Sequence, residues 1–175
     1  QKVAFLTLRV SSTAVFISML LGIPAGIWLA LGQFRGRGII ITLINTGMGL
    51  PPVAAGLLIY LIFSRTSGPL GFLGLLYTPV AMVIAQILIA FPIVSGLTLV
   101  AIQQVDPKLR LQILSLGASR TQMYWTLLKE ARLPALAAVM AGFGGALSEV
   151  GAVMMVGGNI KGQTRVLTTA IVALA

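Results

Sequence analysis

The sequence has no cysteine, no histidine and only three acidic residues among 175. The absence of thiols and imidazoles excludes disulfide bonds, thiolate chemistry, imidazole acid–base catalysis and most zinc sites. Charged residues make up 9% of the chain, whereas a soluble domain carries about 25%. This shortage of charge is too large for a soluble protein, and it predicts a chain that lies in a membrane.

Long apolar stretches take the place of the missing charges. Four of them are near the roughly 20 residues that a transmembrane helix needs to cross the hydrocarbon of a bilayer. We therefore predict an all-α membrane protein, a polytopic transmembrane helix bundle that forms a single domain over residues 1–175. The predicted spans are 10–31, 39–62, 79–102 and 133–156, with a polar loop at 103–132.

The two ends of the chain suggest that more protein surrounds it. The chain starts at Gln1 and finishes in an apolar stretch, so we expect segments to be missing at one or both ends. The tail, residues 157–175, opens on a Gly-Gly-Asn turn and then becomes apolar again. It can be a re-entrant segment, a surface helix or the start of another span.

Proline interrupts the first three predicted spans. Pro24, the Pro51-Pro52 pair and Pro92 each remove a backbone donor, and each is expected to bend its helix. The second span is the most broken, because glycine and polar residues precede its proline pair. Broken helices at membrane depth are typical of transporters, where protein or water satisfies the freed backbone groups. A kink that improves packing is the alternative for any single proline.

Small residues recur at four-residue spacing in the first and fourth spans. Gly22 and Gly26 do so in the first, and Ala138, Gly142 and Ala146 do so in the fourth. Such spacing lets two helices approach closely in a membrane. We interpret these residues as packing positions.

The insert from Gln103 to Pro134 is the one strongly polar stretch and holds seven of the charged residues. Asp106 can cap a helix whose first residue is Pro107, and Gly117 can end it. The apolar face of this short helix is predicted to contain Leu109, Ile113 and Leu116. A second helix follows, because Ser119 and a glutamine three residues later form a capping-box pattern.

The net charge of +9 comes from twelve lysine and arginine residues. We interpret them as loop residues that face lipid head groups, so membrane lipid is an expected partner and nucleic acid is not. One side of the predicted membrane has Arg35, Arg37, Lys108, Arg110, Arg120, Lys129 and Arg132. The other side has Lys2, Arg9, Arg65, Lys161 and Arg165. The excess on the first side favours a cytoplasmic insert.

The insert resembles the EAA loop of type I ABC importer permeases. That family's pattern is Glu-Ala-Ala, three residues, Gly, nine residues and Ile-x-Leu-Pro, and it is matched by Gly117 and Leu133-Pro134. Two departures stand out. The Glu-Ala-Ala positions are Leu111, Gln112 and Ile113, and Leu133-Pro134 lies four residues, about one helical turn, later than the pattern.

A second stretch narrows the resemblance. Residues 148–160 and 164–171 are similar to the same region of tungstate permeases, which are relatives of the molybdate and sulfate permeases, and so is the stretch 45–52. The likeness runs from about Leu6 to the end of the chain. It implies an importer permease for tungstate, with molybdate as a further cargo. Alternatives are the same type of permease for sulfate, phosphate or another small solute.

The resemblance also implies partners and a location. Two copies of the chain would form the path, two ABC ATPase subunits would dock on the cytoplasmic side, and an extracytoplasmic binding protein would deliver the oxyanion. The chain would cross the inner, or plasma, membrane several times. It lacks the Gly-x-x-x-x-Gly-Lys-Ser/Thr phosphate loop. We therefore expect no cofactor, metal or catalytic residue on this chain, with ATP and Mg bound by the partner ATPases.

Two sets of candidate site residues follow. For coupling to the ATPase they are Asp106, Pro107, Leu109, Arg110, Ile113, Leu114, Leu116, Gly117, Ala118 and Ser119. For the translocation path or its gate they are Asn45, Thr46, Pro51, Pro52, Ser148, Glu149 and Asn159.

Glu149 is the acidic residue expected at membrane depth, where a charge must face protein or water. An acid is a poor ligand for a dianion, so we expect a structural ion pair or a hydrogen-bond anchor, with a gate as the alternative. The expected partners are Arg165, Lys161 or a hydroxyl of a span.

Two hypotheses from other classes are weaker. An intramembrane enzyme lacks support, because no histidine, cysteine or pair of acids converges within the predicted spans. A purely structural membrane scaffold does not explain the broken second span.

Overall fold

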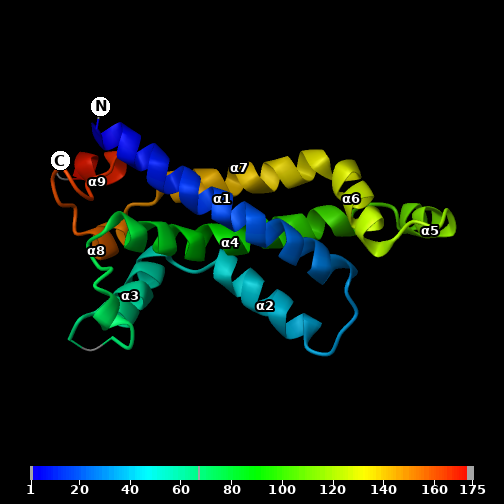
Figure 1. Ribbon diagram of the computed structural model, residues 1–175, viewed down its shortest axis with the longest axis horizontal. Coiled ribbons are helices and arrows are strands. Elements are labelled where there is room, and N and C mark those ends of the chain that lie inside the picture. The colour runs from blue at the N-terminus through cyan, green and yellow to red at the C-terminus, as the bar shows by residue number, and fades with distance from the viewer. Residues whose placement is uncertain (1, 67, 173–175) are drawn as a thin grey trace.

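Three long helices form the body of the molecule in the computed structural model, which describes residues 2–66 and 68–172. They are α1 (Lys2–Leu31), α4 (Pro79–Gln103) and α7 (Arg132–Ser148), and they run alongside one another (Figure 1). The central one is α4, which packs against both of the others. The described residues form helices and turns without a strand, so the predicted all-α bundle is confirmed.

Two of these helices are long and apolar enough to cross a membrane by themselves, over Val3–Leu31 and Pro79–Gln103. The first begins earlier than the predicted residue 10. The polar Thr7 is accommodated in this earlier part of the helix, because its hydroxyl donates to the carbonyl of Val3 one turn before it.

The predicted second span is split into two helices. α2 (Arg37–Met48) and α3 (Pro52–Phe63) meet at an angle of 107°. The pair Pro51-Pro52 removes two successive donors, and the residue before a proline is pushed out of the helical region. Pro51 accordingly has an extended ψ of 129°. By contrast, Pro24 and Pro92 lie inside α1 and α4, which continue past them.

The predicted fourth span ends early. α7 stops at Ser148, and a separate short helix, α8 (Gly151–Gly157), follows two residues later. At its other end α7 makes an angle of 75° with α6 (Arg120–Glu130), the last helix of the polar insert. Thus two of the four predicted spans belong to bent pairs of helices rather than to single straight ones.

Small residues pack the long helices closely, as predicted. A methyl group at Gly26 of α1 would lie 2.7 Å from the carbonyl oxygen of Ser95 in α4. One at Gly142 of α7 would lie 2.7 Å from the Cγ2 of Val94, also in α4. Ala138 and Ala146 are buried on the same helix as Gly142. These positions let α1 and α7 both lie directly against α4.

The tail turns back onto the start of the chain. After α8, Gly158 and Asn159 both have positive φ values, of 68° and 50°, and a six-residue helix, α9 (Leu167–Val172), follows. The backbone amide of Leu167 donates to the Thr7 hydroxyl of α1 at 2.9 Å. The final part of the predicted tail, 173–175, lies outside the described residues.

Candidate functional site

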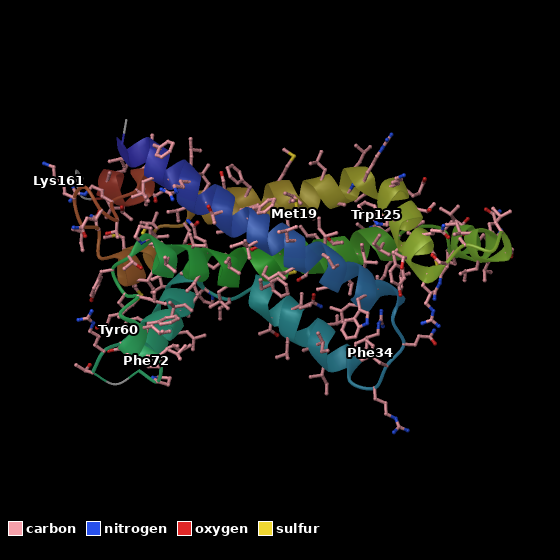
Figure 2. The ribbon with its side chains drawn as sticks, viewed as in Figure 1. Met19, Phe34, Tyr60, Phe72, Trp125 and Lys161 are labelled. Carbon is pink, nitrogen blue, oxygen red and sulfur yellow. The ribbon has the colours of Figure 1, made fainter. Side chains whose placement is uncertain are left out.

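The polar insert forms two helices at one end of the bundle. α5 (Pro107–Ser115) and α6 lie at the end opposite to α9 and to the start of α1 (Figure 1). In Figure 2, Trp125 of α6 lies toward this end and Lys161 lies at the far one. The loop between α1 and α2 is also at the insert end, because Gln33 and Phe34 line a pocket together with Arg110 and Arg120.

The predicted caps of both helices are confirmed. The Asp106 carboxylate accepts the Lys108 amide at 2.8 Å, and Pro107 is the first residue of α5. Ser119 and Gln122 form the complete capping box at the start of α6. In that box the Ser119 amide donates to Gln122 Oε1 at 2.8 Å, and the Gln122 amide donates to Ser119 Oγ at 3.3 Å.

Gly117 makes the turn between the two helices. Its φ of +78° lies in the left-handed region, and a Cβ built on it would meet nothing within 4 Å. Glycine adopts this conformation without the strain that other residues suffer. The Ala118 amide donates to the carbonyl of Ile113, which closes the end of α5. The predicted turn at Gly117 is therefore a requirement of the backbone and not of space.

One apolar residue anchors α5 to the bundle. Ile113 is 8% exposed and belongs to a cluster that includes Met123 and Leu127 of α6, Ile102 of α4 and Ile27 of α1. The partly buried Leu109 packs against the same cluster. The cluster therefore joins α5, through α6, to the ends of α1 and α4 that lie beside the insert.

The predicted apolar face of α5 is wrong at Leu116. This residue is the C-cap of α5 and is 87% exposed, since the helix ends before it and the helical spacing no longer applies. Leu111 is 65% exposed and Leu114 is 41% exposed. The outer surface of the insert therefore presents Leu111 and Leu116, whereas Leu114 lines the pocket that Arg110 and Arg120 also line. Sequence reasoning did not count Leu111 as a contact residue, although it occupies the first position of the family pattern.

The two broken regions come together at the other end of the bundle. α3 and α8 pack against each other, each just after a break in a longer apolar segment. A Cβ at Gly56 would lie 2.6 Å from the Cα of Ala152, and one at Gly151 would lie 2.6 Å from the Cγ2 of Val53. The Pro51-Pro52 break and the Ser148-Glu149 break are thus neighbours in space, although about 100 residues separate them in sequence.

Glu149 holds the start of α8. Its side chain is 6% exposed, and Oε1 accepts the Ala152 amide at 2.7 Å. Its backbone carbonyl accepts the Thr168 hydroxyl at 3.2 Å. The expected pairing with Arg165 is wrong, because that guanidinium donates to Asn159 Oδ1 at 3.1 Å. The carboxylate therefore caps a helix, as expected of a hydrogen-bond anchor.

The remaining path candidates are divided between two places. Asn45 and Thr46 are exposed on α2, beyond the bend from α3. Pro51, Pro52 and Ser148 are exposed at the paired breaks. Asn159 is not with them, since its side chain donates to the carbonyl of Thr169 in α9 at 3.3 Å and accepts from Arg165. Its contacts give it a structural position in the tail.

Sequence reasoning missed Gln86 of α4, which is one of several buried polar residues among those described. It is 3% exposed, and its Nε2 donates to the carbonyl of Ala146 in α7 at 2.9 Å. Its Oε1 has no partner among the described residues. The signal in the sequence was a glutamine in the first half of the predicted span 79–102, where every other residue up to Val94 is apolar. Its bond ties α4 to α7 shortly before the break at Glu149.

Comparison with known proteins gives a consistent family. A model of the family described as "Binding-protein-dependent transport system inner membrane component" matches residues 22–173. The probable anion ABC transporter permease protein of Haloferax volcanii is 41% identical over 170 residues, which cover 94% of this chain and 73% of that protein. The tungstate uptake system permease protein TupB of Peptoclostridium acidaminophilum is 41% identical over 172 residues, covering 98% and 75%.

A more distant relative is named for the transport of a different element. The molybdenum transport system permease protein ModB of Escherichia coli K12 is 28% identical over 180 residues, which cover 97% of this chain and 77% of that protein. The family match spans most of the chain, and the first two relatives are well above 30% identity. The chain therefore belongs to the family of inner-membrane components of binding-protein-dependent transport systems, and it is a multi-pass membrane permease.

Proposed function

We propose that this chain is the permease subunit of an ABC importer that moves an oxyanion, tungstate first and molybdate second, into the cytoplasm. The observation that supports tungstate as the cargo is the 41% identity to a tungstate uptake permease over 98% of the chain. The same extent of similarity to a probable anion permease supports a negatively charged cargo. The stretch 148–171, on which the tungstate resemblance rested, includes the break at Glu149 and the turn to α9.

In this proposal, α5 is the element that contacts the ATPase. Its most exposed leucines, Leu111 and Leu116, suit insertion into a groove of a partner, because a short helix held at both ends presents an apolar surface. Asp106, Pro107 and Gly117 shape the helix and its turn, and Ala118 and Ser119 lead into α6. Ile113 and Leu109 face the bundle and transmit the movement.

Hydrolysis belongs to the partner in this proposal. Two ATPase subunits with bound ATP and Mg would dock under two copies of this chain, and an extracytoplasmic binding protein would load the cargo. Closure of the ATPases would push α5 and, through the Ile113 cluster, the ends of α1 and α4. The long helices would then rock between inward-facing and outward-facing states.

The paired breaks are the proposed gate. Exposed backbone and side chains at Pro51, Pro52 and Ser148 would line the path, together with Asn45 and Thr46 of α2. Broken helices at membrane depth supply free backbone groups that suit a small polar cargo. Glu149 is assigned no contact with the cargo, because its carboxylate caps α8 and would repel an anion.

A transport assay with the whole complex tests the cargo. The full-length permease, its ATPase and its binding protein are reconstituted in vesicles, and uptake of labelled tungstate is measured with molybdate, sulfate or phosphate as competitors. We expect tungstate uptake that requires ATP, strong competition by molybdate and little competition by sulfate. Uptake of sulfate or phosphate without competition by tungstate would reassign the cargo. A complex that binds no ATPase would point to the scaffold alternative.

A further inference from the structure

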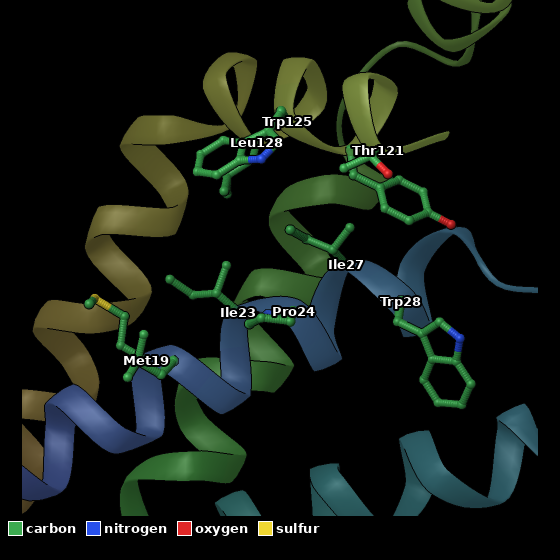
Figure 3. Close-up of a pocket in the computed structure, with 10 residues that line it drawn as sticks. Met19, Ile23, Pro24, Ile27, Trp28, Thr121, Trp125 and Leu128 are labelled. Carbon is green, nitrogen blue, oxygen red and sulfur yellow. The ribbon is translucent and has the colours of Figure 1, made fainter. Parts of the chain in front are cut away.

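An apolar groove of about 550 Å³ lies between α1 and α6 (Figure 3). Trp125 and Leu128 on α6 face Ile23 and Ile27 on α1 across it. Both tryptophans of the chain, Trp28 and Trp125, are among the residues that line the groove. Trp28 is 49% exposed and Trp125 is 62% exposed. The groove is therefore a large apolar surface that the described residues leave open.

The groove continues into a second hollow of different chemistry. This hollow has a volume of about 450 Å³ and shares Trp28 and Tyr124 with the groove. Its polar lining residues include Arg110, Arg120 and Gln33, and both arginines carry a positive charge. The apolar groove and the hollow that contains the two arginines are therefore adjacent parts of one surface.

The acidic residues of the chain lie elsewhere. Asp106 and Glu130 line a different hollow, beside Pro134. Glu149 is buried at the start of α8. Since the sequence has only three acids, neither arginine faces a carboxylate of this chain within its hollow. Arginine binds phosphate oxygens with paired, charge-assisted hydrogen bonds, so these two side chains suit a phosphate group.

Local contacts fix the walls of the second hollow. The ring of Trp28 stacks on that of Phe34 with centroids 4.3 Å apart. The Nε of Arg37 donates to the carbonyl of Leu29 at 2.7 Å, which ties the loop after α1 to the helix. Tryptophan and tyrosine gather at the level of lipid head groups, and arginine on the cytoplasmic side faces the anionic leaflet. The hollow therefore has the composition of a membrane interface.

We propose that this surface binds one anionic phospholipid of the cytoplasmic leaflet, with an acyl chain in the α1–α6 groove and its phosphate on Arg110 and Arg120. Such a lipid would touch α1, α5 and α6 together. It would therefore hold the insert against the first long helix and would favour one position of α5. A zwitterionic lipid offers the same acyl chain, but its positive group would oppose the two arginines.

The two tryptophans make the site directly measurable. The full-length permease–ATPase complex is reconstituted in vesicles that contain phosphatidylglycerol or phosphatidylcholine with brominated acyl chains, which quench nearby tryptophans. Subtraction of a variant with both Trp28→Phe and Trp125→Phe isolates the signal of the groove. We expect phosphatidylglycerol to bind about fivefold more tightly than phosphatidylcholine for each arginine that it contacts.

Two matched variants test which arginine produces the preference for the anionic lipid. Arg120→Gln removes a guanidinium that lines the hollow, and Arg132→Gln removes one at the start of α7 that does not. We expect Arg120→Gln to lose about fivefold of the preference and Arg132→Gln to keep it. Equal losses in the two variants would mean general surface attraction and would overturn the proposal.

Two further outcomes decide the occupant. Equal quenching by the two lipids would overturn the phosphate site. Absence of quenching by either would mean that a second copy or the ATPase covers the groove, and would also overturn the proposal. Inorganic phosphate added as a competitor separates a site for the free ion from one for the lipid. If the acyl chain contributes, millimolar phosphate leaves the quenching unchanged.

Discussion

The two ends of the bundle are held together in different ways. At the insert end, side chains cap α5 and α6, and a single glycine turns the chain between them. At the other end, α3 and α8 meet through glycine and alanine, with almost no room between their backbones. The first arrangement depends on residues close in sequence, and the second depends on contacts between distant segments. A local element of this kind is able to move as a unit, whereas the close contact must slide or separate.

The largest expected effect is at the α3–α8 contact. Gly56→Ala places a methyl group 2.6 Å from the Cα of Ala152, so the helices must separate. We expect a loss of about 1–3 kcal/mol of stability, as overpacked sites show. Gly144→Ala is the matched control, because it lies inside α7 and a Cβ there meets nothing within 4 Å. It should be neutral or stabilising. Thermal unfolding of both variants measures the difference, and similar melting temperatures would contradict the close contact.

The next effect concerns the helix cap of α8. Glu149→Ala leaves the Ala152 amide without its acceptor in a buried place, which costs about 1–3 kcal/mol. Glu149→Gln keeps an acceptor oxygen and removes the charge, so it should lose less than half as much. If the role were an ion pair, the two variants would be equally unstable. The exposed Glu130→Ala at the insert end is the control and should unfold like the unaltered protein in the same thermal assay.

A smaller and local effect is expected at Gly117. Gly117→Val forces a branched residue to a φ of +78° and costs roughly 1–2 kcal/mol, while Gly117→Asn is tolerated better. We expect ATP hydrolysis stimulated by the loaded binding protein to fall about tenfold in the valine variant. Gly162→Val is the control at the other end, with a φ of +84° and similarly open space. An equal fall of stimulated ATP hydrolysis in both valine variants would mean that the turn at Gly117 is not specifically required for coupling.

The smallest effect on stability is expected on the outer surface of α5. Leu111 is 65% exposed, so Leu111→Ser should change the free energy of unfolding by less than about 0.5 kcal/mol. Its association with the ATPase should nevertheless weaken about tenfold, since an exposed leucine in an interface loses apolar burial. Leu73→Ser, at the other end, should leave association unchanged. Titration of each purified variant with the ATPase measures its association. Undiminished association of the Leu111→Ser variant would move the contact away from this surface.

The same contrast explains what the sequence predicted. Asp106, Gly117 and Ser119 act on residues within four positions of themselves, so their caps and turn followed from spacing alone. The break at Glu149 did not follow, because it depends on a carboxylate that caps α8 and on a hydroxyl from Thr168, nineteen residues later.

Proline was an ambiguous signal for the same reason. Pro92 lies inside a helix that neighbours support on several sides, and one missing donor does not end it. The tandem pair at Pro51 removes two donors in succession and does end its helix. The groove beside Trp125 was also beyond prediction, because it is formed by α1 and α6, which the rest of the chain brings together.

The central helix has a mechanical consequence. α4 has 25 residues, contacts α1, α2, α3, α7 and α8, and ends where the insert begins. A helix of this length extends about 37 Å, and it runs along most of the bundle (Figure 1). One continuous helix therefore joins the neighbourhood of Ile102 to the contact with α8, and Pro92 is the point inside it where a backbone donor is missing. In the proposed mechanism, the distance that the ATPases travel would then set the width to which the proposed gate opens.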